Sequence, residues 1–140
     1  MPIDKEELGS PQDWLTRARS NLIFGQVAKP EGVLWEELCF QLQQCVEKSI
    51  KAVLVQNEVV FPFIHNLSKL ITLMKEDGIP WPDELDEAAE LTVYAVETRY
   101  PGDIQPVTEE EHQQVLKIAE RVYAWAEAII AQPHPSPTAQ

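Results

Sequence analysis

The chain has 140 residues, 44% of them apolar, which is enough for one domain with a single core of ordinary size. Eleven basic against 23 acidic residues give a formal charge of −12, which disfavours non-specific binding to DNA. The N-terminus is acidic and no apolar run approaches the roughly 18 residues of a membrane span, so we expect a cytoplasmic protein without a membrane segment.

The first predicted helix begins at residue 10. Residues 1–9 carry no apolar periodicity, and we expect them to be flexible. Ser10 suits the N-cap of a helix and Pro11 its first turn. The buried side of this helix would hold three apolar residues at steps of four: Trp14, Ala18 and Leu22. The glycine and proline residues between 25 and 32 would then end it.

The second predicted helix covers residues 34–55 and has two unlike faces. One face carries apolar residues at steps of three and four: Trp35, Cys39, Leu42, Val46, Ile50 and Val53. Several polar residues fall off that stripe: Gln43, Gln44, Glu47, Lys48 and Lys51. Cys39 and Cys45 would lie about 9 Å apart along one helix, beyond the reach of a disulfide bond. We expect both thiols to be reduced and buried.

Three further helices are predicted in the second half of the chain. The third covers residues 65–76, starting at His65 and ending at the Asp77-Gly78 turn. The fourth starts at the capping residue Asp83 and ends at Pro101-Gly102, and its predicted inner face carries Leu85, Ala88, Ala89, Thr92 and Val96. The fifth begins at Thr108, which forms a capping box with the acidic residues that follow it, and runs to residue 132. Residues 133–140 are proline-rich and predicted to be disordered.

Short connections between long amphipathic helices favour antiparallel neighbours. The predicted fold is therefore all-α, an up-and-down antiparallel bundle of four to five helices formed by one domain at residues 10–132. We expect the four tryptophans to be core or interface residues rather than platforms for stacking nucleic-acid bases.

Four segments in a fixed order resemble the HEPN domain family, a nucleotide-binding or nuclease-like helical module of higher eukaryotes and prokaryotes. They are DWLTRARSNL at 13–22, FQLQQCVEKSIKAVLV at 40–55, HNL at 65–67 and RYPGD at 99–103. The resemblance covers almost the whole chain. It implies a helical bundle, and a polar site formed by the HNL histidine together with the RYP segment.

The candidate ligand-binding residues are Lys48, Lys51, His65, Arg99 and Tyr100. Lys48 and Lys51 are three residues apart and could clamp one phosphate, although exposed helices carry such lysines for solubility as well. His65 could contact a ligand, or could form hydrogen bonds at the start of its helix.

Other polar residues could support this site. His65 could reach Gln44 or Glu47 across the groove between two helices. Arg99 could bind helix-end carbonyl groups or Glu47 and so fix the turn that follows it. Tyr123 is a weaker candidate for the same site.

The ribonuclease motif of the family is missing. Catalytic members carry an arginine, four to six intervening residues and then a histidine, and no histidine of this chain follows an arginine at that spacing. Motifs for other enzymes, including GxxxxGK, HExxH and GxSxG, are absent. The single ExxH that ends at His112 is better explained by the capping box, so we expect no metal site and no cofactor.

The sequence therefore predicts a non-catalytic HEPN-like domain that binds a nucleotide or a protein partner. The resemblance implies a minimal nucleotidyltransferase as that partner, in a toxin-antitoxin pair or as an accessory subunit, and we expect a homodimer. Two alternatives remain open. One is a HEPN ribonuclease whose active site is degenerate or completed across a dimer, and the other is a purely structural homodimer.

Overall fold

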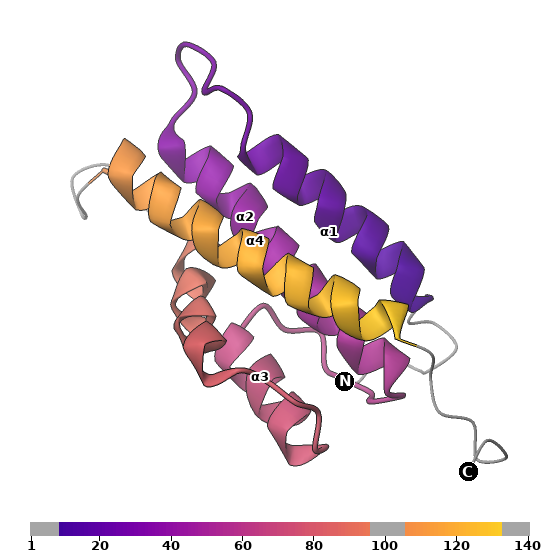
Figure 1. Ribbon diagram of the computed structural model, residues 1–140. Helices are drawn as coiled ribbons and strands as arrows, with labels where there is room; N and C mark the ends of the chain where they lie inside the picture. Colours follow the sequence, from indigo (N-terminus) through magenta and orange to yellow (C-terminus); the bar gives the residue numbers. More distant parts are fainter. Residues whose placement is uncertain (1–8, 96–105, 133–140) are drawn as a thin grey trace, which may run out of the picture.

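A computed structural model of the chain describes residues 9–95 and 106–132, and the regular structure in these residues consists of helices. The described residues form four α-helices and one 3-10 helix, η2, and Figure 1 shows how the helices are arranged. Their bounds are α1 Pro11–Gly25, α2 Trp35–Gln56, α3 Leu67–Glu76, η2 Asp83–Ala95 and α4 Glu109–Ala131. The predicted all-α fold is confirmed. Flexibility was predicted for both termini, and residues 1–8 and 133–140 lie outside the described part.

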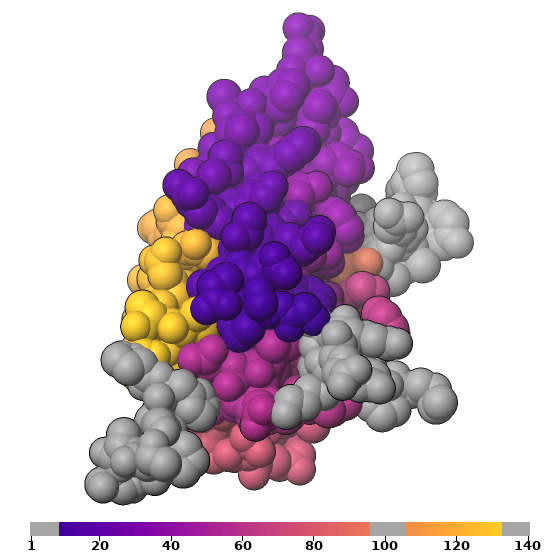
Figure 2. Space-filling model, turned by 90° about the vertical axis from the view of Figure 1, so that its right-hand side faces the viewer, coloured from indigo at the N-terminus to yellow at the C-terminus, as the bar shows by residue number. Residues whose placement is uncertain are grey.

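Helix α2 is the centre of the bundle, and both α1 and α4 pack along it. Figure 2 shows α1 across the middle of one face, with α4 along one side and α2 along the other. His112 at the start of α4 contacts Gly25 at the end of α1 and Trp35 at the start of α2. Helix α1 is therefore antiparallel to both α2 and α4, whereas α2 and α4 run in the same direction.

Gly25 is essential to this packing. A Cβ atom at Gly25 would lie 2.5 Å from the Leu42 side chain and 3.2 Å from the Leu38 carbonyl oxygen. The absence of a side chain lets α1 end directly against α2. His112 Nε2 lies 2.7 Å from the Gly25 carbonyl oxygen, and the imidazole ring packs on Trp35 with ring centroids 4.8 Å apart. His112, the last residue of the ExxH segment, thus has a structural role.

The polar side of α2 is buried as well as its apolar stripe. Gln43 is 0% exposed, Glu47 3% and Lys51 5%. The sequence predicts an apolar face and a polar face, which suits a helix at the surface, but α2 is surrounded by other elements along most of its length. Burying these charges requires partners for them.

Side-chain caps fix the starts of three α-helices. The Ser10 and Thr108 hydroxyl groups accept hydrogen bonds from the backbone N–H groups of the third residue beyond each of them, as predicted. Asn66 does the same for α3, which begins at Leu67 and not at the predicted His65. His65 lies two residues before the first helical residue, so its side chain is placed by the preceding loop.

The fourth predicted helix is a 3-10 helix over the described residues. Its buried side chains, Leu85, Ala88 and Leu91, are spaced by three, which matches the 3-10 repeat of three residues per turn. The prediction assumed an α-helical repeat: it left out Leu91, which is buried, and it placed Ala89 and Thr92 on the inner face, where they are only half-buried. Val96, the last residue of the predicted face, lies outside the described residues. The predicted end of the helix at Pro101-Gly102 lies outside the described residues.

None of the described helices combines the length and the apolar character that a membrane crossing requires.

Candidate functional site

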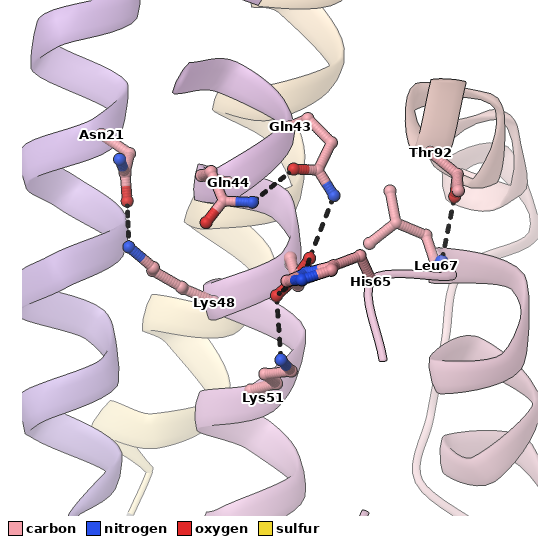
Figure 3. A network of polar contacts seen from close by, with 9 residues as sticks. Asn21, Gln43, Gln44, Lys48, Lys51, His65, Leu67 and Thr92 are labelled. Atoms are coloured by element: carbon pink, nitrogen blue, oxygen red, sulfur yellow. Dashed lines mark hydrogen bonds and ion pairs between the residues drawn. The ribbon is translucent and has the colours of Figure 1, made fainter. Parts of the chain in front are cut away.

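A buried carboxylate, Glu47, organises a polar network on α2 (Figure 3). Lys51 Nζ donates to Glu47 Oε2 at 2.8 Å, and Gln43 Nε2 donates to Oε1 at 3.1 Å. His65 Nδ1 lies 2.9 Å from Oε1 and 3.2 Å from Oε2. Spacing by four puts Gln43, Glu47 and Lys51 on one side of the helix, and the loop before α3 brings His65 to the same carboxylate.

The negative charge of Glu47 is stabilised by the side chains around it. Burial alone would raise the pKa of this carboxyl group, but Lys51, together with hydrogen bonds from Gln43 and His65, outweighs that effect and holds the pKa below its ordinary value. The Lys51 side chain is only 6% exposed. Its ammonium group also lies 5.6 Å from the Trp14 ring centroid and 5.4 Å from that of Phe61, within the range of cation–π attraction. Lys51 is therefore an internal counter-charge.

His65 differs from its partner in exposure. Its side chain is 68% exposed, whereas that of Glu47 is 4% exposed. A carboxylate only accepts hydrogen bonds, so the imidazole nitrogen facing it, Nδ1, must carry a hydrogen. In the neutral ring Nε2 then has a free lone pair, and it takes part in no hydrogen bond with the described residues. The arrangement presents a fixed imidazole with a free acceptor nitrogen.

The three residues of the HNL segment have different structural roles. His65 extends the Glu47 network to the surface, and Asn66 caps α3 by accepting a hydrogen bond from the Lys69 backbone at 3.1 Å. Leu67 is fully buried, and its backbone N–H donates to Thr92 Oγ1 at 2.9 Å (Figure 3). The anchored Leu67 and the capped helix hold the loop that carries His65.

Lys48 faces α1. Its Nζ atom donates to Asn21 Oδ1 at 2.9 Å, and Asn21 Nδ2 in turn donates to Gln41 Oε1 at 2.8 Å. Burial, together with the nearby cations Arg17 and Lys51, lowers the pKa of Lys48 against the opposing effect of Glu47. Figure 3 shows the Lys48 and Lys51 side chains reaching different partners. A clamp of one phosphate by both lysines would require Lys51 to leave Glu47.

The structure thus brings Glu47, Lys51 and His65 together and places Lys48 beside Asn21. Gln44 joins the network indirectly, through a 2.7 Å hydrogen bond to Gln43 Oε1. Arg99 and Tyr100 lie outside the described residues. The sequence prediction missed Gln43 as a direct partner of Glu47, although its i, i+4 spacing indicates it. It also missed Asn21, for which no local spacing gives a signal.

Tyr123 lies away from this network. Its hydroxyl group donates to Glu127 on the same helix at 3.3 Å, and its ring lines a separate pocket of about 440 Å3 that also contains Arg19. Burial and the Glu127 carboxylate raise the pKa of the Tyr123 hydroxyl.

The cysteines and the tryptophans pack in or against the hydrophobic core. Cys39 and Cys45 are both buried and neither forms a disulfide bond, as predicted, and burial raises the pKa of Cys45 to about 12. Trp81 is buried, and the other three tryptophans are partly buried against the core. Among residues 9–95 and 106–132, no group of three or more His, Cys, Asp or Glu side chains is arranged to hold a metal ion.

The fold and the network define a helical bundle domain built around a buried carboxylate that holds a surface histidine. The profile of the HEPN domain matches residues 11–129, so the chain belongs to the HEPN domain family. The crystal structure of an archaeal HEPN homologue is similar to it, with 26% identity and a TM-score of 0.69 over 87% of this chain and 98% of that one. Among curated proteins, no relative matches the chain.

Proposed function

We propose that this chain is a non-catalytic HEPN domain that binds a nucleotide at the surface around His65 and acts together with a minimal nucleotidyltransferase. One observation carries the proposal: a 68% exposed imidazole is held by a carboxylate that is 4% exposed. Burying Glu47 and Lys51 costs desolvation free energy, and an apolar pair of similar size would often stabilise a core as well. A role in orienting His65 for a ligand explains why the chain carries this ion pair in place of an apolar pair.

The chemistry of His65 suits parts of a nucleotide. The free lone pair on Nε2 can accept a hydrogen bond from an exocyclic amino group of a base or from a ribose hydroxyl. When the ring is protonated, Nε2–H can donate to a phosphate oxygen. Lys48 supplies a partly exposed cation on the same helix as Glu47, and Lys51 keeps the carboxylate ionised. The family resemblance adds Arg99 and Tyr100 as ligand residues.

A thermal-shift screen with ATP, GTP, AMP and related nucleotides tests the binding. A ligand that binds only the native state raises its stability, by about 2.7 kcal/mol at a concentration of 100 times Kd. We expect a rise in melting temperature that is reduced in His65→Ala and Lys48→Ala. Lys117→Ala, an exposed lysine on α4, is the matched control and should respond like the parent protein. No shift with any nucleotide would refute nucleotide binding.

The partner is tested separately. The proposal predicts that a minimal nucleotidyltransferase encoded beside this chain co-purifies with it after co-expression. If the partner docks at the surface around His65, His65→Ala should weaken the complex. If only the nucleotide binds at that surface, His65→Ala should leave the complex unchanged. If no nucleotidyltransferase encoded beside this chain co-purifies with it, the proposed partner is refuted.

A second function, RNA cleavage, is favoured by one specific feature. Glu47 and His65 form a carboxylate–imidazole pair whose outer nitrogen could accept the proton of a ribose 2′-hydroxyl group as its oxygen attacks the adjacent phosphorus. The leaving 5′-oxygen would take a proton from water. Incubating labelled single-stranded RNA or tRNA with the protein and EDTA separates the two functions. We expect no cleavage, and cleavage that disappears in His65→Ala would overturn the non-catalytic proposal.

The proposed homodimer is supported by exposed apolar side chains. Four of them lie at the end of α1 and in the segment before α2: Ile23, Phe24, Val27 and Leu34. Burying such side chains against a second copy would remove apolar area from water. Equilibrium sedimentation should give a dimer that Phe24→Glu dissociates, and a monomeric parent protein at high concentration would contradict it.

A further inference from the structure

A second pocket, of about 660 Å3, lies where α2 and α4 end. Its walls come from the C-terminus of α2, the segment between α3 and η2, and the last turns of α4. None of its lining residues belongs to the Glu47–His65 network. Its volume falls in the usual range of roughly 300 to 1,000 Å3 for small-molecule sites.

Two tryptophans form fixed walls of this pocket. The rings of Trp81 and Trp125 meet edge to face at 85°, with centroids 4.9 Å apart. Trp81 Nε1 donates to Asp86 Oδ1 at 2.7 Å, and Trp125 Nε1 donates to the Pro80 carbonyl oxygen at 3.3 Å. Because each indole N–H has its own partner, both rings are oriented before any ligand arrives. A pre-formed aromatic wall reduces the entropy that binding loses.

The polar groups of the pocket are uncharged. Among the residues that the structure describes, no acidic or basic side chain lines it, in a chain with a formal charge of −12. Besides the two indole N–H groups, its hydrogen-bonding side chains are the carboxamides of Gln56, Asn57 and Gln132. Asn57 Nδ2 donates to the Val53 carbonyl oxygen at 2.9 Å, which leaves the Asn57 amide oxygen as an acceptor.

The other two carboxamides are available to a ligand. Within the part of the chain that the structure describes, the Gln56 and Gln132 side chains make no hydrogen bond. A carboxamide offers both donors and an acceptor, so it can pair with the edge of a heteroaromatic ring. An anionic group in the pocket would lose hydration without gaining a cation as its partner.

We infer that this pocket binds an uncharged, planar heteroaromatic molecule. The ring packs against the Trp125 indole, with Ile79 and Ile129 providing further apolar contact, and its polar edge meets the carboxamides. The inference is independent of the proposed function, because it uses different residues and excludes a phosphate.

Indole N–H signals in a 1H–15N NMR spectrum provide the test, since two of the four tryptophans line the pocket and two do not. The probes are adenosine, cytidine and caffeine, with AMP as the charged counterpart of adenosine. We expect at least one neutral probe to shift the Trp81 and Trp125 signals saturably while leaving those of Trp14 and Trp35 in place. AMP should bind this pocket at least tenfold more weakly than adenosine.

Two variants complete the design. Ala128 is an exposed lining residue, so Ala128→Arg should obstruct the pocket without disturbing the core and should lower probe affinity at least tenfold. His65→Ala should leave the affinity unchanged, which separates this pocket from the proposed nucleotide site. The inference is overturned if no neutral probe moves the two signals, if Ala128→Arg binds as well as the parent protein, or if Ala128→Arg dissociates a dimer in sedimentation, which would place a second copy of the chain over the pocket.

Discussion

Replacing Glu47 by glutamine should destabilise the fold strongly. Glutamine has nearly the same shape as glutamate, but it carries no charge and one of its two acceptor oxygens becomes an NH2 group. Lys51, whose side chain is 6% exposed, then carries a positive charge without a carboxylate partner. The new NH2 group also faces a hydrogen-bond donor of a neighbouring side chain. Removing one partner of a buried ion pair costs about 3 to 5 kcal/mol. For a chain of this length we expect a fall in melting temperature of about 10 to 17 °C.

Urea unfolding followed by circular dichroism measures this loss, and two further variants show its cause. Glu120→Gln, at an exposed position of α4, should change the free energy of unfolding by less than about 0.5 kcal/mol. Adding Lys51→Met to Glu47→Gln removes the unpaired charge, and the double variant should recover about 2 kcal/mol. A loss below about 1 kcal/mol in Glu47→Gln, or no recovery in the double variant, would refute the buried ion pair.

The same variant has a predicted pH dependence. The folded-state pKa of Glu47 lies below its ordinary value, so its ionisation stabilises the fold above that value. This contribution is lost as the pH falls through the ordinary glutamate range towards the folded-state pKa. The stability difference between the parent protein and Glu47→Gln should therefore shrink on acidification. A difference that stays constant or grows in that range would contradict the assignment.

Three other predictions concern packing, capping and thiol chemistry. Gly25→Ala should cost about 2 kcal/mol because its Cβ would overlap Leu42, and adding Leu42→Val should restore part of the loss in the same urea assay. Thr108→Ala should cost about 1 kcal/mol by removing the α4 cap, whereas Thr108→Asn should be nearly neutral. Burial raises the pKa of Cys45 to about 12, so iodoacetamide at pH 8 should label it only after unfolding, and rapid labelling of the native protein would contradict its burial.

The helices were predictable from the sequence because their signals are local. Caps at Ser10 and Thr108 and apolar steps of three and four each depend on residues within a few positions of one another. The 3-10 geometry of η2 was not predicted, although the spacing of Leu85, Ala88 and Leu91 by three is compatible with it. Such short apolar spacings also fit one turn of an α-helix, so the sequence alone does not separate the two.

The candidate site was predictable in part. The sequence indicated His65 through the family resemblance, Lys51 through its spacing from Lys48, and Glu47 as a polar partner within reach of His65; these three lie together in the structure. It did not indicate that Lys51 would be buried, because burial of a polar stripe depends on which elements surround α2. The hydrogen bond between Lys48 and Asn21 joins residues 27 positions apart, and only the packing of α1 on α2 creates it.

The central claim is that Glu47 fixes the His65 ring with Nε2 free for a ligand. The 15N chemical shifts of the His65 ring, measured at a pH where the imidazole is neutral, report directly which nitrogen carries the hydrogen. We predict the Nδ1–H form in the parent protein and a loss of that preference in Glu47→Gln. A predominant Nε2–H form in the parent protein, or a tautomer preference that Glu47→Gln leaves unchanged, would contradict the account.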